Sequence, residues 1–248
     1  MIDLTLGQEK KKDKRQKTMM DFPTNSIRCA SCDPAYKNLG WTVLDYHERF
    51  WKEKDIIKGH EIVDLEKYSA LSEEEVFQEK SSGKMLHMVQ EHLYAKYKQH
   101  SPIQELVLEN LKGPQASRIM MLMGCTLTGF FEGIKTKSED DTFQVYEEII
   151  TAAFRRRLAQ YLKVELDLTT LKQLCPSFSR KRIITHKEDA IILVLTLLNE
   201  QVKQGSSSAK RWLDFLLEMT EYDKIDDICE AYLLNLQHMC NKWNILKK

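Results

Sequence analysis

The sequence has no long hydrophobic run and no excess of either charge. No apolar stretch approaches the roughly 18–20 residues that span a bilayer, so the sequence predicts no membrane-spanning helix. Basic and acidic residues number 37 each, which gives a formal net charge of +0 at pH 7. Any site for a polyanion must therefore come from local clusters of basic residues. With 42% hydrophobic and 30% charged residues, the composition is typical of one large or two small globular domains.

Cysteines are few and scattered, which argues against a disulfide scaffold. The chain has 6 cysteines, and only Cys29 and Cys32 form a close pair. A zinc site usually needs a second close pair. A redox CxxC motif normally begins a helix, whereas this pair lies in a strand-like run. We therefore interpret both as small apolar strand residues and expect a reducing compartment.

The first 25 residues differ in composition from the rest. They contain EKKKDKRQK and few apolar residues. We expect residues 1–25 to be a disordered basic tail, and their polar, basic start is unlike a secretory signal. A nuclear signal, a DNA-binding arm and a solvated tail without a specific role all remain open. Residues 26–248 are expected to form one domain.

The order of expected elements favours an α/β fold. Early strands would form an antiparallel meander, and later elements alternate between strand and helix before a helical C-terminal part. This order predicts a five-stranded mixed sheet flanked by helices, with a flexible joint at 204–208. The strands are expected at 27–33, 40–46, within 50–65, 104–110 and 143–149, and the helices at 72–100 (interrupted near 81–83), 115–135, 151–163, 186–203, 209–220 and 225–243.

Two of the expected strands end on a carboxylate. Asp33 ends the run SIRCASCD, and Glu109 ends QELVLE. In an open α/β sheet, ligands bind at the carboxyl ends of the strands, so the two acids would converge if their strands are neighbours. Close carboxylates repel unless a proton or a cation intervenes. Hard oxygen ligands suit Mg²⁺.

The last expected helix supplies further acids. Asp226, Asp227 and Glu230 lie beside its apolar stripe and not within it. Residues three or four apart share a helix face, so either Asp could join Glu230 in one site. Spacing does not choose between them, although Asp226 is nearer the apolar edge and is expected to be the more buried. The stripe consists of Ile225, Ile228, Cys229, Tyr232 and Leu236.

Each acid also has a simpler explanation. An Asp before proline is common in turns, and Glu109 would fit an exposed strand end. Acids in the first turn of a helix favour its dipole, which alone accounts for Asp226 and Asp227. A helical adaptor whose acids are all solvated is therefore one alternative.

Three stretches resemble the RuvC-type Holliday junction resolvases of poxviruses, other large DNA viruses and fungal mitochondria. They are CDPAYKNLGW at 32–41, LVLEN at 106–110 and YDKIDDICEAYL at 222–233, and the resemblance covers about 26–240. The sequence departs from the family at Glu230, where the family has Asp, and at Asn110, where it has Gln. A second stretch, HKED at 186–189, resembles the His-x-x-Asp ending of some bacterial members and ranks below the helix at 225.

The resemblance implies an RNase H-like fold and a homodimer that cleaves four-way or other branched DNA. It also implies two Mg²⁺ ions per site, with Mn²⁺ as a substitute, about 4 Å apart. One ion would activate water and the other would stabilise the leaving 3′ oxygen, with Asp33 as the bridging ligand. In the family, the helix that corresponds to residues 115–135 of this chain makes much of the dimer contact. The catalytic and metal-binding residues would be Asp33, Glu109, Asp226, Asp227 and Glu230.

Basic clusters are the candidates for DNA contacts. Three adjacent cations repel one another unless an anion is near, so the two triplets are favoured, although a single basic residue is more often plain surface. No aromatic residue follows Glu109 in its loop, so we predict no stacking wedge. The candidates are Lys37, Lys112, Arg118, Arg155, Arg156, Arg157, Arg180, Lys181, Arg182 and Lys224, and secondarily Lys163, Lys210 and Arg211.

Two further functions compete with junction cleavage. One is a different RNase H-like nuclease, such as an RNase H or a transposase-like enzyme. The other is a catalytically inactive module that binds branched DNA, which the Glu at position 230 favours. A viral replication site in the host cytoplasm or nucleus would suit the resemblance, and so would a mitochondrion.

Overall fold

The computed structural model describes residues 26–34, 39–69, 82–110, 118–137, 142–176, 185–219 and 225–246. The expected basic tail at 1–25 and the expected helix start at 72 lie outside these residues. The elements are β1 (Ser26–Asp33), β2 (Leu39–His47), α1 (Glu48–Lys52), β3 (His60–Tyr68), α3 (Ser82–His100), β4 (Glu105–Glu109), α4 (Arg118–Lys137), β5 (Gln144–Glu148), α5 (Ala152–Leu162), α6 (Leu168–Leu174), α7 (His186–Lys203), α8 (Ser207–Met219) and α9 (Asp226–Lys242).

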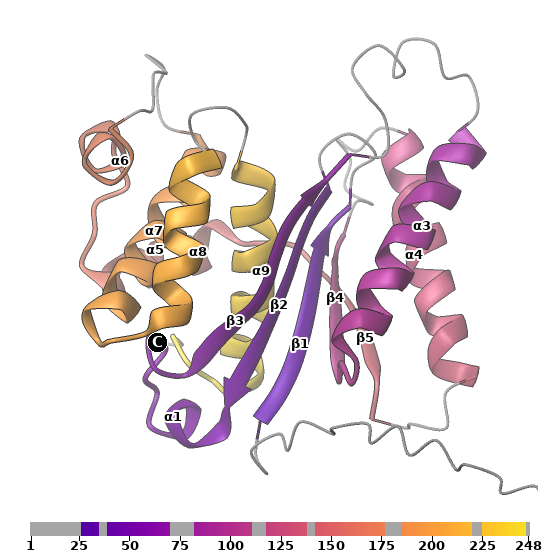
Figure 1. Cartoon of the computed structure of the whole chain (residues 1–248), viewed down its shortest axis with the longest axis horizontal. Coiled ribbons are helices and arrows are strands. Elements are labelled where there is room, and N and C mark those ends of the chain that lie inside the picture. Colours follow the sequence, from indigo (N-terminus) through magenta and orange to yellow (C-terminus); the bar gives the residue numbers. More distant parts are fainter. Residues whose placement is uncertain are drawn as a thin grey trace, which may run out of the picture.

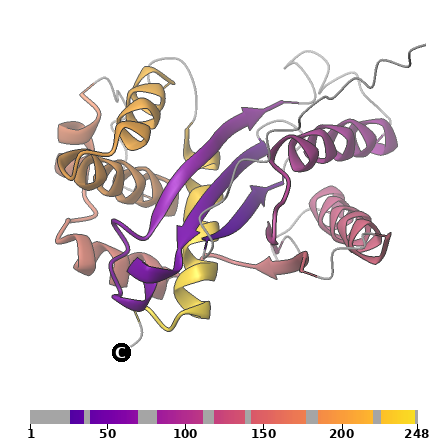
Figure 2. The ribbon, with the colours of Figure 1, turned by 60° about the horizontal axis from the view of Figure 1, so that its bottom comes forward.

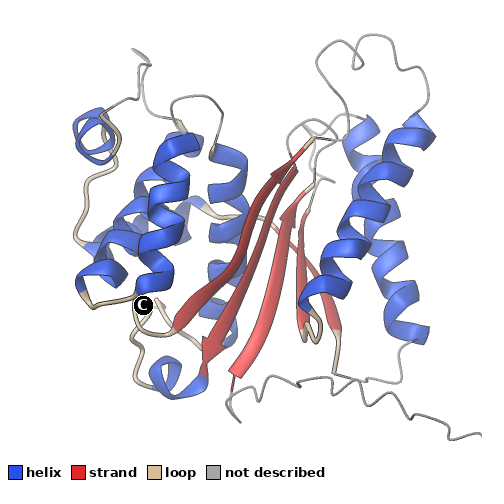
Figure 3. Ribbon diagram, viewed as in Figure 1, coloured by secondary structure: helices blue, strands red, loops and turns tan. Residues whose placement is uncertain are grey.

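The strands form one mixed sheet in the order β3-β2-β1-β4-β5 (Figure 3). The first three strands pair antiparallel, as a meander does, and β1–β4 and β4–β5 pair parallel. This confirms the predicted α/β class and the five-stranded mixed sheet. Because β1 and β4 are parallel neighbours, their carboxyl ends lie at the same edge of the sheet.

Helices cover both faces of the sheet. Figure 1 shows α3 and α4 on one face, and α9 with α5, α7 and α8 on the other; Figure 2 shows the same division from a second direction. α9 packs against β1, β2 and β4 and also against α7. It is therefore buried on every side from Asp226 to Cys240, as expected for a helix in the interior of a domain.

Strand alternation decides which face each side chain takes. Cys29 belongs to the core on the α9 side, whereas Ala30 and Cys32 belong to the core under α3 and α4. Asp33 is in phase with Cys29 and therefore faces α9. In β4, Val107 lies in the core on the α9 side, so Glu109 also faces α9. Cys29 and Cys32 are buried and unbonded on opposite faces, which confirms their interpretation as strand residues.

The local structure differs from the expectations in three places. The third strand, expected within 50–65, is β3 and ends three residues later, and the short helix α1 before it was not predicted; its buried Trp51 packs on Tyr46 with ring centroids 5.1 Å apart. Helix α6 was not predicted, although the Asp167 side chain caps it by accepting from the Thr170 N–H. The expected joint at 204–208 is shorter, since α8 begins at Ser207. None of the described helices is long and apolar enough to cross a membrane.

Gly40 sets how closely α9 approaches the sheet. It is paired with Asp33 across β1 and β2. A Cβ atom at Gly40 would lie 2.1 Å from the backbone oxygen of Asp227, so no larger residue fits without a backbone shift. The absence of a side chain allows the first turn of α9 to lie directly on β2, next to the strand end that carries Asp33.

We predict that G40A will destabilise the protein by about 1–3 kcal/mol, the usual cost of an overpacked core. The added methyl group must push the start of α9 away from β2. Chemical denaturation would measure the change. G129A is the matched control, because a Cβ at Gly129 in α4 meets nothing within 4 Å. Equal stability of G40A and wild type would contradict the close approach.

Candidate functional site

Asp33 and Glu109 lie side by side at the carboxyl ends of β1 and β4. Cys32 and Leu108 are register partners in the parallel pair, so the residues that follow them are adjacent. Their carboxyl groups lie within hydrogen-bonding reach of each other. Burial raises the pKa of Asp33 well above its usual value, and the charge of Glu109 and the hydrogen bond with it raise this pKa further.

Helix α9 brings two more acids to this pair. The charges of Asp227 and Glu230 also raise the pKa of Asp33, so three other carboxylates lie within electrostatic reach of Asp33. Asp227 and Glu230 are 6% and 7% exposed, and Asp226 is 5% exposed. Asp226 is thus the more buried of the two aspartates, as expected, although the difference is too small to choose between them as ligands. The helical adaptor with solvated acids is also excluded, since none of these three acids is solvated.

Two cations of the chain itself contact the acids of α9. The Lys187 ammonium nitrogen lies 2.7 Å from Asp226 Oδ2 and 3.0 Å from Asp227 Oδ1, and its side chain is 43% exposed. The Arg155 guanidinium lies 2.6 Å from Glu230 Oε2. Burial would lower the pKa of Lys187, but the hydrogen bonds and charges of the two aspartates raise it overall.

Two of these acids have an oxygen atom without a partner in the described part of the chain. Asp227 Oδ2 and Glu230 Oε1 are buried and accept no hydrogen bond from any described residue. Burial raises the pKa of Asp227 and of Glu230 although a cation pairs with each. A buried, unpaired carboxylate oxygen is costly, and a hard divalent cation would satisfy such oxygens. The donor set therefore fits Mg²⁺ or Mn²⁺.

The same acids do not yet converge as ligands of one ion. In the described part of the chain, no three His, Cys, Asp or Glu side chains are grouped closely enough to hold a metal. Lys187 and Arg155 pair with the acids of α9, while Asp33 and Glu109 lie against each other.

The basic triplet at 155–157 does not form one DNA-binding surface. Arg155 is buried and paired with Glu230, so its assignment as a DNA contact was wrong. Arg156 is exposed, and Arg157 is half-buried with an unpartnered Nε. The remaining main candidates for DNA contacts lie outside the described residues. They are Lys37, Lys112, Arg180, Lys181, Arg182 and Lys224, and the side chain of Arg118 is also not described.

The stretch HKED at 186–189 lies beside the acids but does not replace α9. Glu188 and Thr185 form a capping box at the start of α7, so the Glu188 carboxylate is already engaged. Lys187 contacts Asp226 and Asp227, and the backbone oxygen of His186 accepts from Arg155. Sequence analysis did not identify Lys187 as part of the site. The only signal for it was its position in HKED, the stretch that resembles a family motif.

A second charged cluster lies at the far end of β4 and α9. His238 Nε2 is 2.8 Å from Glu105 and its Nδ1 is 2.5 Å from Glu148, and Lys242 also pairs with Glu105. Burial would lower the pKa of His238, but the two carboxylates raise it to about 9. Glu105 and Glu109 lie at opposite ends of β4, so this cluster fixes the last turns of α9 to the sheet. Sequence analysis missed this cluster.

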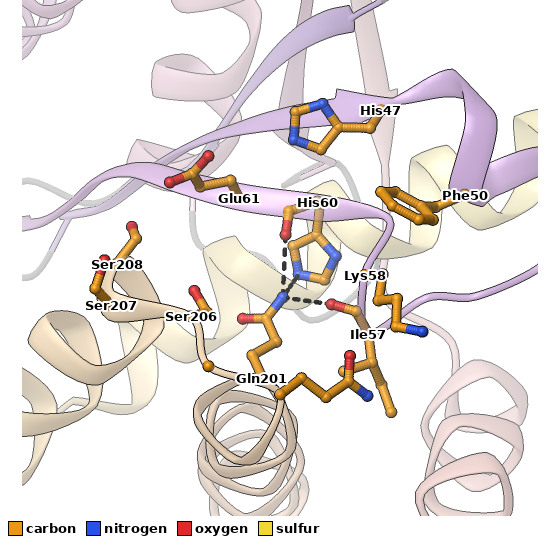
Figure 4. A pocket seen from close by; sticks show the side chains of 12 residues that line it. His47, Phe50, Ile57, Lys58, His60, Glu61, Gln201, Ser206, Ser207 and Ser208 are labelled. Carbon is orange, nitrogen blue, oxygen red and sulfur yellow. Dashed lines mark hydrogen bonds between the residues drawn. The ribbon is translucent and has the colours of Figure 1, made fainter.

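The pocket in Figure 4 is separate from the acids. It has a volume of about 390 Å³ and is lined by residues such as His47, Lys58 and Ser207. Gln201 crosses its floor and donates to the backbone oxygens of Ile57 and His60 (Figure 4). His47 pairs with Ser26 at the first residue of β1, whereas Asp33 is the last residue of that strand.

No protein-family model matches the chain, and no curated protein matches it in sequence. Three solved structures are similar in fold. The fowlpox virus resolvase with substrate Holliday junction DNA has a TM-score of 0.45 and 11% identity, covering 87% of this chain and 99% of that one. T. thermophilus RuvC with a Holliday junction substrate has a TM-score of 0.45 and 10% identity, covering 87% and 96%. The yeast mitochondrial Holliday junction resolvase Ydc2 has a TM-score of 0.47 and 11% identity, covering 90% and 86%.

At these identities and TM-scores, we infer function from the acidic side chains themselves and not from the similarity.

We predict that D33N will raise the melting temperature of the metal-free protein at pH 7. Folding raises the pKa of Asp33 above the unfolded value of 3.8, so the native state binds the proton more tightly than the unfolded state does. The stability contributed by this group is present below pH 3.8 and is lost as the pH rises through the folded pKa. The neutral amide avoids this loss, and each kcal/mol gained raises the melting temperature by about 2–4 °C.

Thermal melts in EDTA between pH 4 and pH 8 would check this, and the gain should grow with pH. D214N is the control, because Asp214 is an exposed acid that pairs with Lys210. A lower melting temperature for D33N at pH 7 would show that Asp33 is not under repulsion from its neighbours.

Proposed function

We propose that this chain is a metal-dependent endonuclease that cleaves four-way DNA junctions. One observation carries the proposal: Asp33 and Glu109, from two adjacent parallel strand ends, meet Asp227 and Glu230 from one turn of a buried helix. Such a concentration of buried and half-buried carboxylates is unfavourable for folding and favourable for binding divalent cations. The three motifs that resemble RuvC-type resolvases contain these same acids, which supports junction DNA as the substrate.

The proposed roles follow from position. Two divalent ions, Mg²⁺ or Mn²⁺, would supply an activated water and stabilise the leaving oxygen of the phosphodiester. Asp33 lies between Glu109 on the neighbouring strand and the acids of α9, so it is the best placed to bridge both ions. Glu109, Asp227 and Glu230 would complete the ligand set. Asp226 is paired with Lys187, and we propose it as an alternative ligand to Asp227.

We predict that D33N, E109Q and E230Q will each lower junction cleavage by more than about 100-fold. Loss of a residue that only hydrogen-bonds to a metal ligand already lowers metal affinity or activity by about 10–100-fold. Each variant removes one carboxylate charge and leaves the surface unchanged, so junction binding should persist. The measurement is cleavage of a labelled four-way junction with Mg²⁺ or Mn²⁺, alongside a gel shift in EDTA. E165Q is the control, because Glu165 is exposed in the loop before α6.

The same assay separates the competing functions. Near-normal cleavage by D33N would refute the assignment of the site. Faster cleavage of an RNA–DNA hybrid than of the junction would indicate a different RNase H-like nuclease. Junction binding by the wild type without cleavage in either metal would indicate an inactive binding module. The buried, unpaired Oε1 of Glu230 argues for an active site.

We predict that L122E will convert a homodimer into a monomer. The resemblance assigns the dimer contact to the helix that corresponds to α4, and Met121 and Leu122 on α4 are 37% and 47% exposed. A buried charge at such a contact has no partner and is costly. Sedimentation velocity would measure the change. I149E is the control, because Ile149 is 59% exposed and lies outside α4; dissociation by I149E alone, or a monomeric wild type, would contradict the prediction.

A further inference from the structure

Arg155 is the one fully buried residue of the arginine triplet at 155–157. Its residue is 6% exposed. One terminal nitrogen lies 2.6 Å from Glu230 Oε2, and the other lies 2.6 Å from the backbone oxygen of His186. The side chain therefore starts on α5, is held at the first residue of α7 and ends on an acid of α9. A guanidinium suits this task because its donors have a fixed planar arrangement.

The two oxygens of Glu230 have different surroundings. Oε2 accepts from Arg155, whereas Oε1 is buried and has no partner. The charge of Glu230 acts on Asp33, and the charge of Glu109 acts on Glu230. Arg155 thus occupies one oxygen of the carboxylate and leaves the other available to the acidic cluster.

We propose that Arg155 is a positioning residue for the metal site: it holds Oε2 of Glu230 so that Oε1 alone is presented to a divalent cation. This inference rests on the proposed function, since it concerns the same acids. A glutamate has one more rotatable bond than an aspartate and can place its oxygens in more ways. The pair of contacts to Glu230 and to the His186 backbone removes that freedom before any ion binds.

The competing explanation is that Arg155 only neutralises a buried charge. The two explanations predict opposite changes in metal affinity. A cation beside a metal ligand repels the metal, so removing only a charge should tighten metal binding. Removing a positioning residue should weaken it, because the ligand oxygen is no longer held in place.

The test is Mn²⁺ binding by the full chain without DNA, measured as free Mn²⁺ by electron paramagnetic resonance. R155Q should raise the Mn²⁺ dissociation constant by about 10-fold or more. R155K keeps the charge but cannot make both contacts in the same geometry, so its affinity should lie between those of R155Q and the wild type. R49Q is the charge-matched control, since Arg49 is exposed on α1 and pairs with Glu53; it should bind Mn²⁺ as the wild type does.

A double variant tests whether Arg155 acts through Glu230. If it does, R155Q/E230Q should bind Mn²⁺ no more weakly than E230Q alone. Additive losses would mean that Arg155 acts elsewhere and would overturn the proposal. Tighter or unchanged Mn²⁺ binding by folded R155Q would also overturn it, in favour of charge neutralisation.

The same measurements distinguish a folding defect of a variant from a failure of the proposed function. Near-UV circular dichroism identifies the folded variants, and R155K with R155K/E230Q carries the test if R155Q does not fold. A wild type that does not bind Mn²⁺, or a D33N variant that binds it normally, would refute the metal site itself. If Mn²⁺ binding by the wild type depends on Asp33 but not on Arg155, only the role of Arg155 is refuted.

Discussion

The structure depends on a backbone contact between α9 and β2. Gly40 has no side chain, so the peptide at Asp227 lies directly on the strand. At the other end of α9, His238 and Lys242 pair with Glu105 at the start of β4. A helix fixed at both ends cannot slide or tilt without losing one of these contacts. The position of the acids on α9 relative to those on β1 and β4 is therefore a property of the packed fold.

This arrangement of acids opposes folding. Asp33, Glu109, Asp226, Asp227 and Glu230 share one region, and Lys187 and Arg155 are the cations that contact them among the described residues. The hydrophobic packing of α9 between the sheet and α7 must outweigh the remaining repulsion. Unfavourable electrostatics of this kind are expected at a functional site and not in an ordinary core. A divalent cation would remove the repulsion, and its binding free energy would add to the stability of the fold.

Element order and the strand-end positions of Asp33 and Glu109 were readable from the sequence, which is why the sheet could be predicted and the two acids could be expected to converge if their strands were neighbours. The contact at Gly40 could not be predicted, because it joins residues far apart in the chain and leaves no local pattern. Arg155 is a different case. It lies three and four residues before Leu158 and Ala159, which are buried, so helical periodicity alone places it on the inner face of α5. Treating the three arginines as one basic run concealed this periodicity, and a charge run is a weaker indicator of direction than the helical period.

Glutamate at position 230 has a physical explanation within this fold. A longer acid could reach an ion if the helix moved back, but α9 is held against β2 at Gly40 and against β4 at Glu105. The adjustment must then come from the Glu230 side chain, which has to adopt a less extended rotamer and keep it. Arg155 contacts Oε2 of Glu230 and is itself held by the His186 backbone. In the proposed metal site, an arginine supplied by a neighbouring helix would do for the longer acid what a shorter side chain would achieve by its length, and the two residues would act as one unit.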